Sequence, residues 1–146
     1  MTSAPSVCWL SSEERASIDD IVALMAHANV EEGRPHPAED LLAEHISRFG
    51  YAGLIHASFH RPALLVGSLT LVPRLSGTDP EFRSQLVELG LVSPDECTRR
   101  AAFVAVGVWG DASLVDLLRK HRDIYPDVVV YASEVADHLE RKGGAE

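Results

Sequence analysis

Five of the seven histidines lie in the first 60 residues: His27, His36, His45, His56 and His60. Histidine titrates close to neutral pH and ligates metals through its neutral ring, so this group could supply a general base or a metal site. The spacing is not that of a metal motif, and we predict no metal. His45 falls on the apolar face of an expected helix, which is typical of a hydrogen-bonded core histidine.

The turn from Val108 to Ser113 precedes an expected helix, and free N–H groups at a helix N-terminus can bind an anion. Asp111 stands at the capping position, where its carboxylate would accept those hydrogen bonds and repel a phosphate. We favour a structural cap, and the alternative is contact with an uncharged or cationic ligand. The residues assigned to ligand binding are Val104, Gly107, Trp109, Gly110 and Ser113.

The one dense basic cluster comprises Arg119, Lys120, His121 and Arg122. A positive patch attracts an acidic partner and speeds the encounter with it, so Arg119, Lys120 and Arg122 are candidate partner-binding residues. The helix dipole alone also favours cations in the last turn of a helix. A solvated helix face is the favoured interpretation of this cluster.

Apolar residues at helical spacing predict amphipathic helices over 18–28 and 41–49, the first capped by Ser17. Two helix-start signals follow, each with a capping residue, a proline and an acid. The first, Thr78-Asp79-Pro80-Glu81, predicts a helix over 80–89, and the second, Ser93-Pro94-Asp95-Glu96, predicts a helix over 94–99. Between the first two predicted helices and the last two, the helical spacing of apolar residues is lost, because residues 51–57 and 63–72 are apolar runs of strand length. They predict a β-hairpin.

Residues 101–139 predict a βαβα unit. Ala101–Trp109 and Val128–Tyr131 are apolar without polar alternation, as expected of central strands covered on both faces. Asp111 would cap the helix between them, and Ser133 would cap a closing helix. The predicted fold class is α/β (α+β), a single mixed β-sheet flanked by helices.

The 146 residues predict one domain, with residues 1–5 and 143–146 disordered and no internal repeat. The net charge of -9 argues against a nucleic-acid partner. No run approaches the ~20 apolar residues of a membrane span, so we predict a cytoplasmic protein. Cys8 and Cys97 do not form a CxxC pair and are expected to be reduced.

The expected order of elements resembles that of a GNAT-like acyltransferase. Within that class, residues 7–10, 51–55, 62–69 and 109–111 resemble the RTX toxin-activating lysine acyltransferases. This resemblance implies transfer of an acyl group from a carrier protein or coenzyme A to an amine, with a histidine removing the proton. It makes His27 and His36 the candidate catalytic bases, because they lie between the first two predicted helices, where that family has its own. It also implies an acyl carrier protein or a protein substrate as partner, no tightly bound cofactor, and possible homodimer formation.

The sequence departs from that family at its catalytic positions. Residues 11–17 contain no histidine after the Trp9-Leu10 pair, and Phe103-Val104-Ala105 stands where the family has an aspartate. The loop by which GNAT enzymes hold the pyrophosphate of acyl-coenzyme A is also missing. The alternative hypothesis is therefore a non-catalytic protein-binding or regulatory module.

Overall fold

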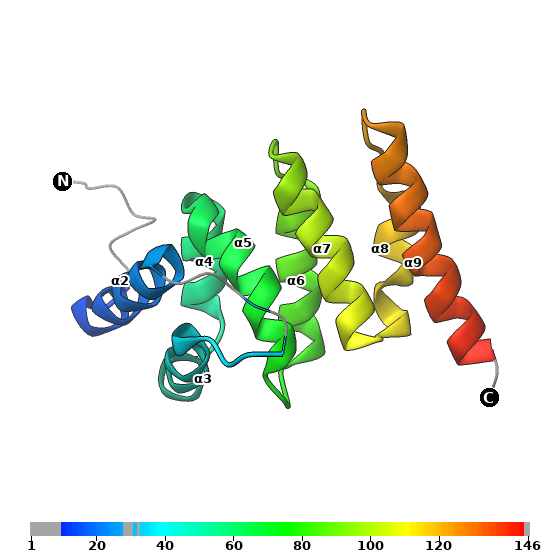
Figure 1. Cartoon of the computed structure of the whole chain (residues 1–146). Helices are drawn as coiled ribbons and strands as arrows, with labels where there is room; N and C mark the ends of the chain where they lie inside the picture. Colours follow the sequence, from blue (N-terminus) through cyan, green and yellow to red (C-terminus); the bar gives the residue numbers. More distant parts are fainter. Residues whose placement is uncertain (1–9, 28–30, 32, 145–146) are drawn as a thin grey trace.

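The computed structural model describes residues 10–27, 31 and 33–144, and within these ranges the chain contains helices and no β-strand (Figure 1). The predicted mixed-sheet class is therefore wrong. The resemblance to a GNAT-like domain is also wrong, because it depended on the order of strands and helices. Residues 1–5, predicted to be disordered, lie outside the described residues, whereas residues 143 and 144 end the last helix.

From α3 onward, the helices are joined to one another by short connections. Their bounds are α2 Ser12–His27, α3 Pro37–Phe49, α4 Ala52–His60, α5 Pro62–Leu71, the 3-10 turn η1 Val72–Arg74, α6 Pro80–Leu91, α7 Glu96–Trp109, the 3-10 turn η2 Ala112–Leu114, α8 Val115–Lys120 and α9 Pro126–Gly144.

The predicted start of the helix at Pro80 is confirmed, because Asp79 accepts from the Glu81 amide at 2.9 Å and caps α6. The helix predicted to begin at Pro94 begins two residues later, at Glu96, because Asp95 is the N-cap of α7 and accepts from the Thr98 amide at 3.1 Å. The predicted cap at Ser17 is wrong, because α2 begins five residues earlier, where Ser11 Oγ accepts from the Glu14 amide at 3.0 Å.

The predicted β-hairpin is a pair of helices. Residues 51–57 belong largely to α4, and residues 63–72 to α5 and the start of η1. Both runs are apolar around their whole circumference, so they lack the periodicity that distinguishes a helix from a buried strand. The turn between them has Pro62 at the first position of α5, where its missing N–H costs no helical hydrogen bond.

The predicted βαβα unit is also corrected. Ala101–Trp109 continues the helix that was expected to end at residue 99, so one helix of 14 residues replaces a helix and a strand. Val128–Tyr131 lies in the first turns of α9, and Ser133 falls inside that helix. Asp111 does act as a cap, here of the 3-10 turn η2, because its Oδ1 accepts from the Ser113 amide at 3.0 Å.

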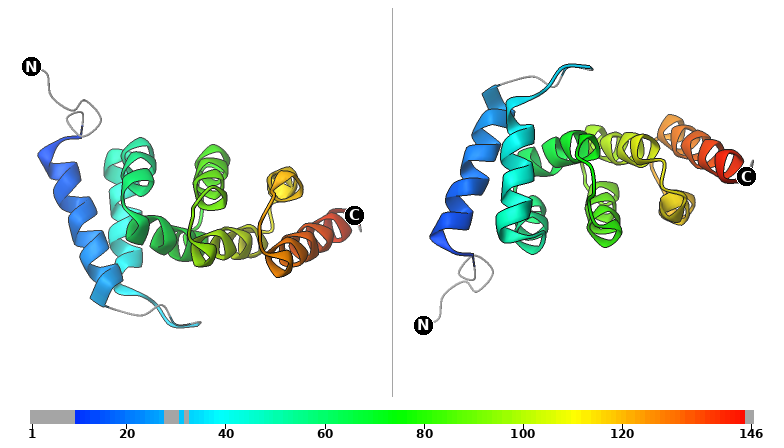
Figure 2. Two further views of the ribbon diagram at one scale, coloured as in Figure 1. Left: turned by 90° about the horizontal axis from the view of Figure 1, so that it is seen from above. Right: turned by 90° about the horizontal axis from the view of Figure 1, so that it is seen from below.

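Successive helix pairs stack side by side, α4 with α5, α6 with α7 and α8 with α9. Figures 1 and 2 show α5, α7 and α9 forming one row and α4, α6 and α8 forming the other. Each pair packs mainly on the next along the chain, which is the architecture of an α-solenoid. The core lies between the two rows.

Corresponding core positions recur from one helix of the first row to the next. Ala102 and Val106 of α7 match Ala132 and Ala136 of α9, about 30 residues further along, and all four are buried. Gly90 of α6 lies where two pairs meet. A Cβ built on it would lie 2.7 Å from a Leu69 methyl and 2.9 Å from the Ala102 Cβ. Glycine thus permits close contact between α6 and both neighbouring helices.

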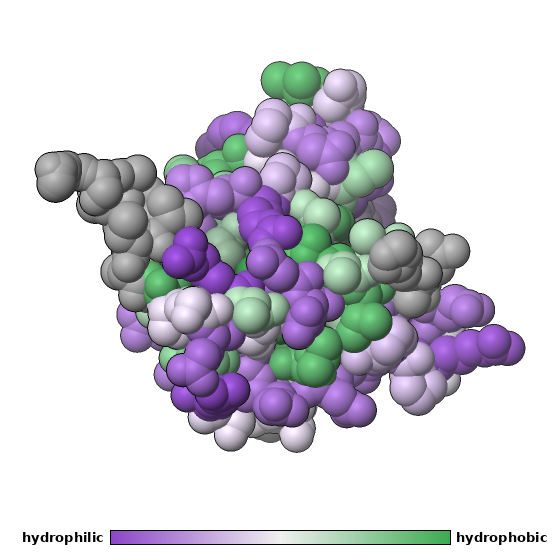
Figure 3. Space-filling model, turned by 90° about the vertical axis from the view of Figure 1, so that its left-hand side faces the viewer, coloured by the Kyte–Doolittle hydropathy of each residue, from purple (hydrophilic) through white to green (hydrophobic). Residues whose placement is uncertain are grey.

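Helices α2 and α3 pack on each other and on α4, α5 and η1, closing the N-terminal end of the stack. This end carries mostly hydrophilic residues around smaller apolar areas (Figure 3). A polar outer face is what a terminal capping unit of a repeat stack requires. In the described part of the chain, no helix combines the length and the apolar character needed to cross a bilayer.

Candidate functional site

The structure describes the side chain of only one of the two predicted catalytic histidines, so the catalytic pair stays a prediction. His36 is buried and caps α3, where its Nδ1 accepts from the Ala38 amide at 3.0 Å. Its own amide donates to Glu39 Oε2 at 2.7 Å, which completes a capping box. The backbone of His27 ends α2, and its side chain lies outside the described residues.

The predicted ligand-binding residues are dispersed rather than gathered. Val104 opens onto the outside of α7, whereas a Cβ on Gly107 would lie 3.8 Å from Val135 of α9. Trp109 is half-buried beneath the Arg83 guanidinium, 5.6 Å from its ring centre. Gly110 ends α7 in the left-handed conformation, and Ser113 donates from its amide and its hydroxyl to Asp111.

The predicted partner-binding cluster is largely occupied by contacts within the chain. Arg119 forms ion pairs with Asp137 and Glu140 of α9. Arg122 donates to backbone carbonyls, including that of Arg119 at 3.3 Å. Lys120 is exposed at the end of α8. The charge of Arg119 therefore serves to join α8 to α9.

A groove of about 580 Å³ runs between α5 and α7 on the outer side of their row, and we call it the outer groove. Val104 is the one predicted ligand-binding residue that lines it. Its full lining is Gly33, Leu69, Thr70, Pro73, Arg74, Ala101, Val104, Ala105 and Val108.

The α7 wall of the outer groove is apolar because α7 has apolar residues also on the side that faces away from the core. Phe103 and Val106 are buried, as expected of a core-facing stripe. On the opposite side, Val104 is 47% exposed and Val108 is 61% exposed. A helix that is apolar all round is normally enclosed, so these residues mark a surface suited to being covered.

Helix α9 shows what an ordinary outer face looks like in the same row. If α7 and α9 are aligned from their first residues, Glu134 takes the place of Val104 and His138 that of Val108. Both residues of α9 are exposed. At these two positions the outer residue is therefore apolar in α7 and polar in α9, although α9 exposes Val130, one turn before Glu134, at 55%.

A second candidate site lies between α2 and α3, and we call its three residues, Glu14, Ser17 and His45, the N-terminal seam. His45 Nε2 lies 3.1 Å from Glu14 Oε2, and Ser17 Oγ lies 2.8 Å from His45 Nδ1. The His45 side chain is fully buried, and Ser17 is half-buried beside a hollow of about 300 Å³. The contacts confirm that His45 is a hydrogen-bonded core histidine.

Burial lowers the pKa of His45, although the neighbouring Glu14 carboxylate opposes this shift. The neutral ring then donates from Nε2 to Glu14, while Nδ1 accepts from the Ser17 hydroxyl. This is the order of groups in a serine–histidine–acid triad. Ser17 stands inside α2, however, where backbone amides donate to carbonyls one turn earlier and cannot form an oxyanion hole. The N-terminal seam therefore joins two helices, and the backbone around Ser17 offers no hydrogen-bond donors that would stabilise an oxyanion.

Glu14 reaches the seam because α4 leaves room for it. A Cβ built on Gly53, the second residue of α4, would lie 2.0 Å from Glu14 Oε2. The carboxylate thus lies against the N-terminus of a helix, where the helix dipole favours negative charge. The seam therefore fastens α2 to both α3 and α4.

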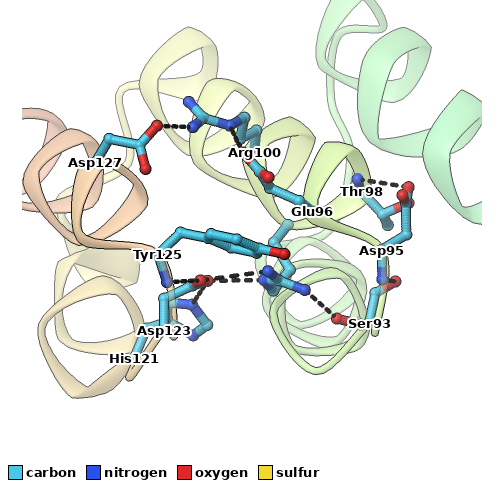
Figure 4. A network of polar contacts seen from close by, with 10 residues as sticks. Ser93, Asp95, Glu96, Thr98, Arg100, His121, Asp123, Tyr125 and Asp127 are labelled. Carbon is cyan, nitrogen blue, oxygen red and sulfur yellow. Dashed lines mark hydrogen bonds and ion pairs between the residues drawn. The ribbon is translucent and has the colours of Figure 1, made fainter.

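At the other end of the stack, Arg99, Asp123 and His121 form what we call the C-terminal seam. Arg99 Nε donates to Asp123 Oδ2 at 2.7 Å, and His121 Nε2 lies 2.9 Å from the same oxygen. Figure 4 shows Asp123 and His121 together at the turn between α8 and α9, beside the ring of Tyr125. The hydrogen bonds from Arg99 and His121 outweigh burial and hold the pKa of Asp123 well below its usual range. This seam is a structural clamp between α7 and the α8–α9 turn.

The sequence reasoning missed the outer groove and both seams. The signal for the groove was the long apolar run 101–109, which is equally typical of a buried strand. The partners in the seams are distant in the chain, so spacing alone does not reveal them. Among the described residues, no group of three or more histidine, cysteine, aspartate or glutamate side chains could hold a metal ion.

In comparisons with known proteins, no family model, curated protein or solved structure matches the chain. The class is therefore defined by the architecture alone, as a short stack of helix pairs of the α-solenoid type.

Proposed function

We propose that the chain is a non-catalytic protein-binding module that holds a partner polypeptide in the outer groove. The observation that supports this most directly is the exposure of Val104 and Val108 on a helix whose later turns are apolar on every side. Stacked helix pairs commonly present such extended surfaces to partners. An apolar patch on a rigid row of helices is suited to recognition by shape and burial.

The lining of the outer groove favours binding over proton transfer. Among the described residues that line it, the only ionisable one is Arg74, and a guanidinium is a hydrogen-bond donor that cannot act as a general base. Thr70 donates its hydroxyl hydrogen to the Val66 carbonyl at 2.8 Å. No histidine side chain that the structure describes lines the groove.

Site-specific photo-crosslinking tests the proposal. A benzophenone amino acid replaces Val104 in one variant and Ile124 in a matched control, since Ile124 is 82% exposed in the α8–α9 turn away from the groove. In extracts of the cells that make the protein, we expect a crosslinked partner from position 104 that is absent from position 124. The partner must then bind the purified chain, with Val108→Glu weakening that binding. Identical products from both positions, or none, would overturn the proposal.

A further inference from the structure

We infer that a second contact site lies at the turns of the stack, where a small pocket takes the uncharged side chain of a tyrosine from a partner polypeptide. We call it the turn pocket. The ends of α4 and α6 and the starts of α5 and α7 line it, at the turns within two successive helix pairs (Figure 1). It shares no lining residue with the outer groove, so the inference does not rest on the proposed function.

The size of the turn pocket fits one aromatic ring. Its volume is about 180 Å³, and an apolar cavity of ~150 Å³ in a protein can hold a benzene molecule. Aromatic rings that contact one another gain stabilisation beyond the area they bury, so the Phe59 ring in the lining favours an aromatic occupant. Most of the lining is apolar and comprises Phe59, Pro62, Leu65, Leu89, Val92 and Pro94.

The charge of the lining favours an uncharged occupant. None of the described residues that line the turn pocket is charged. A carboxylate, phosphate or ammonium group inside it would lose its hydration without gaining a counter-charge. Arg61, in the turn between α4 and α5, is already paired with Asp19 at 2.6 Å.

One buried hydroxyl in the lining gives the occupant a polar end. Ser58 is 1% exposed, and its Oγ has no hydrogen-bond partner in the part of the chain that the structure describes. The other two hydroxyls are engaged, since Thr98 Oγ1 donates to Asp95 Oδ2 at 2.8 Å and Ser93 Oγ accepts from the Asp95 amide at 3.1 Å. A buried hydroxyl without a partner is unfavourable, so a hydrogen-bonding group on the occupant would be stabilised there. The serine hydroxyl turns about a single bond and can donate or accept, as can the phenol hydroxyl of tyrosine.

The rim of the turn pocket favours a polypeptide over a free phenol. Phe59 is 67% exposed and Val92 is 77% exposed, and a single ring inside the pocket would leave much of both side chains in water. The residues on either side of a tyrosine would cover them, as at an interface where an aromatic anchor fills a pocket among weaker contacts. Tyrosine is also enriched at such interfaces, because its ring is apolar and its hydroxyl is polar.

NMR titration of the full chain tests the inference. The probe is a short alanine peptide with one tyrosine and with both ends blocked, and its controls carry phenylalanine or phosphotyrosine instead. We expect the tyrosine peptide to shift backbone amide signals within residues 58–65 and 89–98. It should bind roughly fivefold more tightly than the phenylalanine peptide, as one neutral hydrogen bond allows, and the phosphotyrosine peptide should not bind.

Matched variants locate the hydrogen bond. Ser58→Ala should reduce the affinity for the tyrosine peptide to that for the phenylalanine peptide. Ser68→Ala is the control, because Ser68 is equally buried, its Oγ also has no partner in the described chain, and it does not line the turn pocket. Val104→Glu, in the outer groove, should leave both affinities unchanged. Circular dichroism confirms that each variant is folded.

Three results would overturn the inference. The first is equal binding of the tyrosine and phenylalanine peptides, or an equal effect of Ser58→Ala and Ser68→Ala. The second is binding of free phenol at least as tight as that of the tyrosine peptide, because the turn pocket would then belong to a small molecule. The third is loss of tyrosine binding in Val104→Glu, which would place the peptide in the outer groove.

Discussion

The two seams fasten helices at opposite ends of the stack, and they differ in the group that donates a hydrogen bond to the carboxylate. In the C-terminal seam, Arg99 keeps its charge at every physiological pH and meets the buried Asp123 through two hydrogen bonds. In the N-terminal seam, a neutral His45 meets Glu14 through one. Two buried carboxylate contacts can thus differ in their response to pH. The contact with arginine is permanent, whereas the contact with histidine depends on pH.

The largest effect should come from Asp123→Asn. This change leaves the Arg99 guanidinium, whose side chain is 9% exposed, without its counter-charge. Breaking a buried pair by removing one partner typically lowers the free energy of unfolding by roughly 3–5 kcal/mol. Urea denaturation measures the loss. Asp127→Asn is the control, because Asp127 pairs with Arg100 at the surface. Equal midpoints for the two variants would show that the C-terminal seam is not a clamp.

In the N-terminal seam, substitution of Glu14 or Gly53 should lower the free energy of unfolding by a smaller amount. Glu14→Ala leaves His45 Nε2 without its buried partner, at a cost of about 1–3 kcal/mol. Gly53→Ala should also destabilise the protein, since its methyl group would displace the Glu14 carboxylate. In the double variant the second change should cost little more, and a thermodynamic cycle measures that coupling. Additive losses would contradict the contact between Gly53 and Glu14.

The pH dependence should separate the seams most clearly. Burial lowers the pKa of His45 in the folded chain, so the unfolded chain binds its proton more readily. The stability that a neutral His45 contributes is present above the unfolded pKa of about 6.5 and is lost as the pH falls below it. The lowered pKa of Asp123 keeps its contribution until the pH falls below about 4.

Hydrogen exchange detected by mass spectrometry measures this difference locally. Between pH 7.5 and 5.5, after correction for intrinsic rates, protection should fall in α2 and α3 and persist at the α7 N-terminus. His45→Gln should remove the dependence in that range. Equal loss of protection at both ends would argue against the assigned roles of the two seams.

The smallest effect should come from Ser17→Ala. The hydroxyl is half-buried, so water can replace its hydrogen bond to His45 Nδ1, and the loss in thermal unfolding should stay below about 1 kcal/mol. A fluorophosphonate probe should label the wild-type chain no more than this variant. Labelling that depends on Ser17 would instead show an activated nucleophile.

The sequence predicted the helices that carry a clear amphipathic pattern and failed where that pattern was missing. Residues 18–27, 41–49 and 80–89 have one apolar face, and all are helical. Residues 63–71 and 101–109 are apolar on every side, and the strands predicted for both are wrong. Apolarity on all sides indicates only that a segment is covered, and it says nothing about backbone conformation.

The repeat escaped detection for a related reason. Matching positions agree in burial and not always in residue type, since the buried Thr98 and Val106 of α7 correspond to the buried Val128 and Ala136 of α9. The candidate site was predictable only through Val104. The other residues assigned to ligand binding depended on the expected strand and turn, whose geometry differs from that of a helix.

Gly90 of α6 lies directly behind the two helices that form the outer groove. Because α6 contacts Leu69 of α5 and Ala102 of α7 at this point, it sets the spacing between two successive helix pairs. A larger residue at position 90 would push α6 away from α5 and α7 and so change the curvature of the stack. The width of the outer groove depends on the same spacing, so a residue of α6, in the opposite row, influences the shape of that groove.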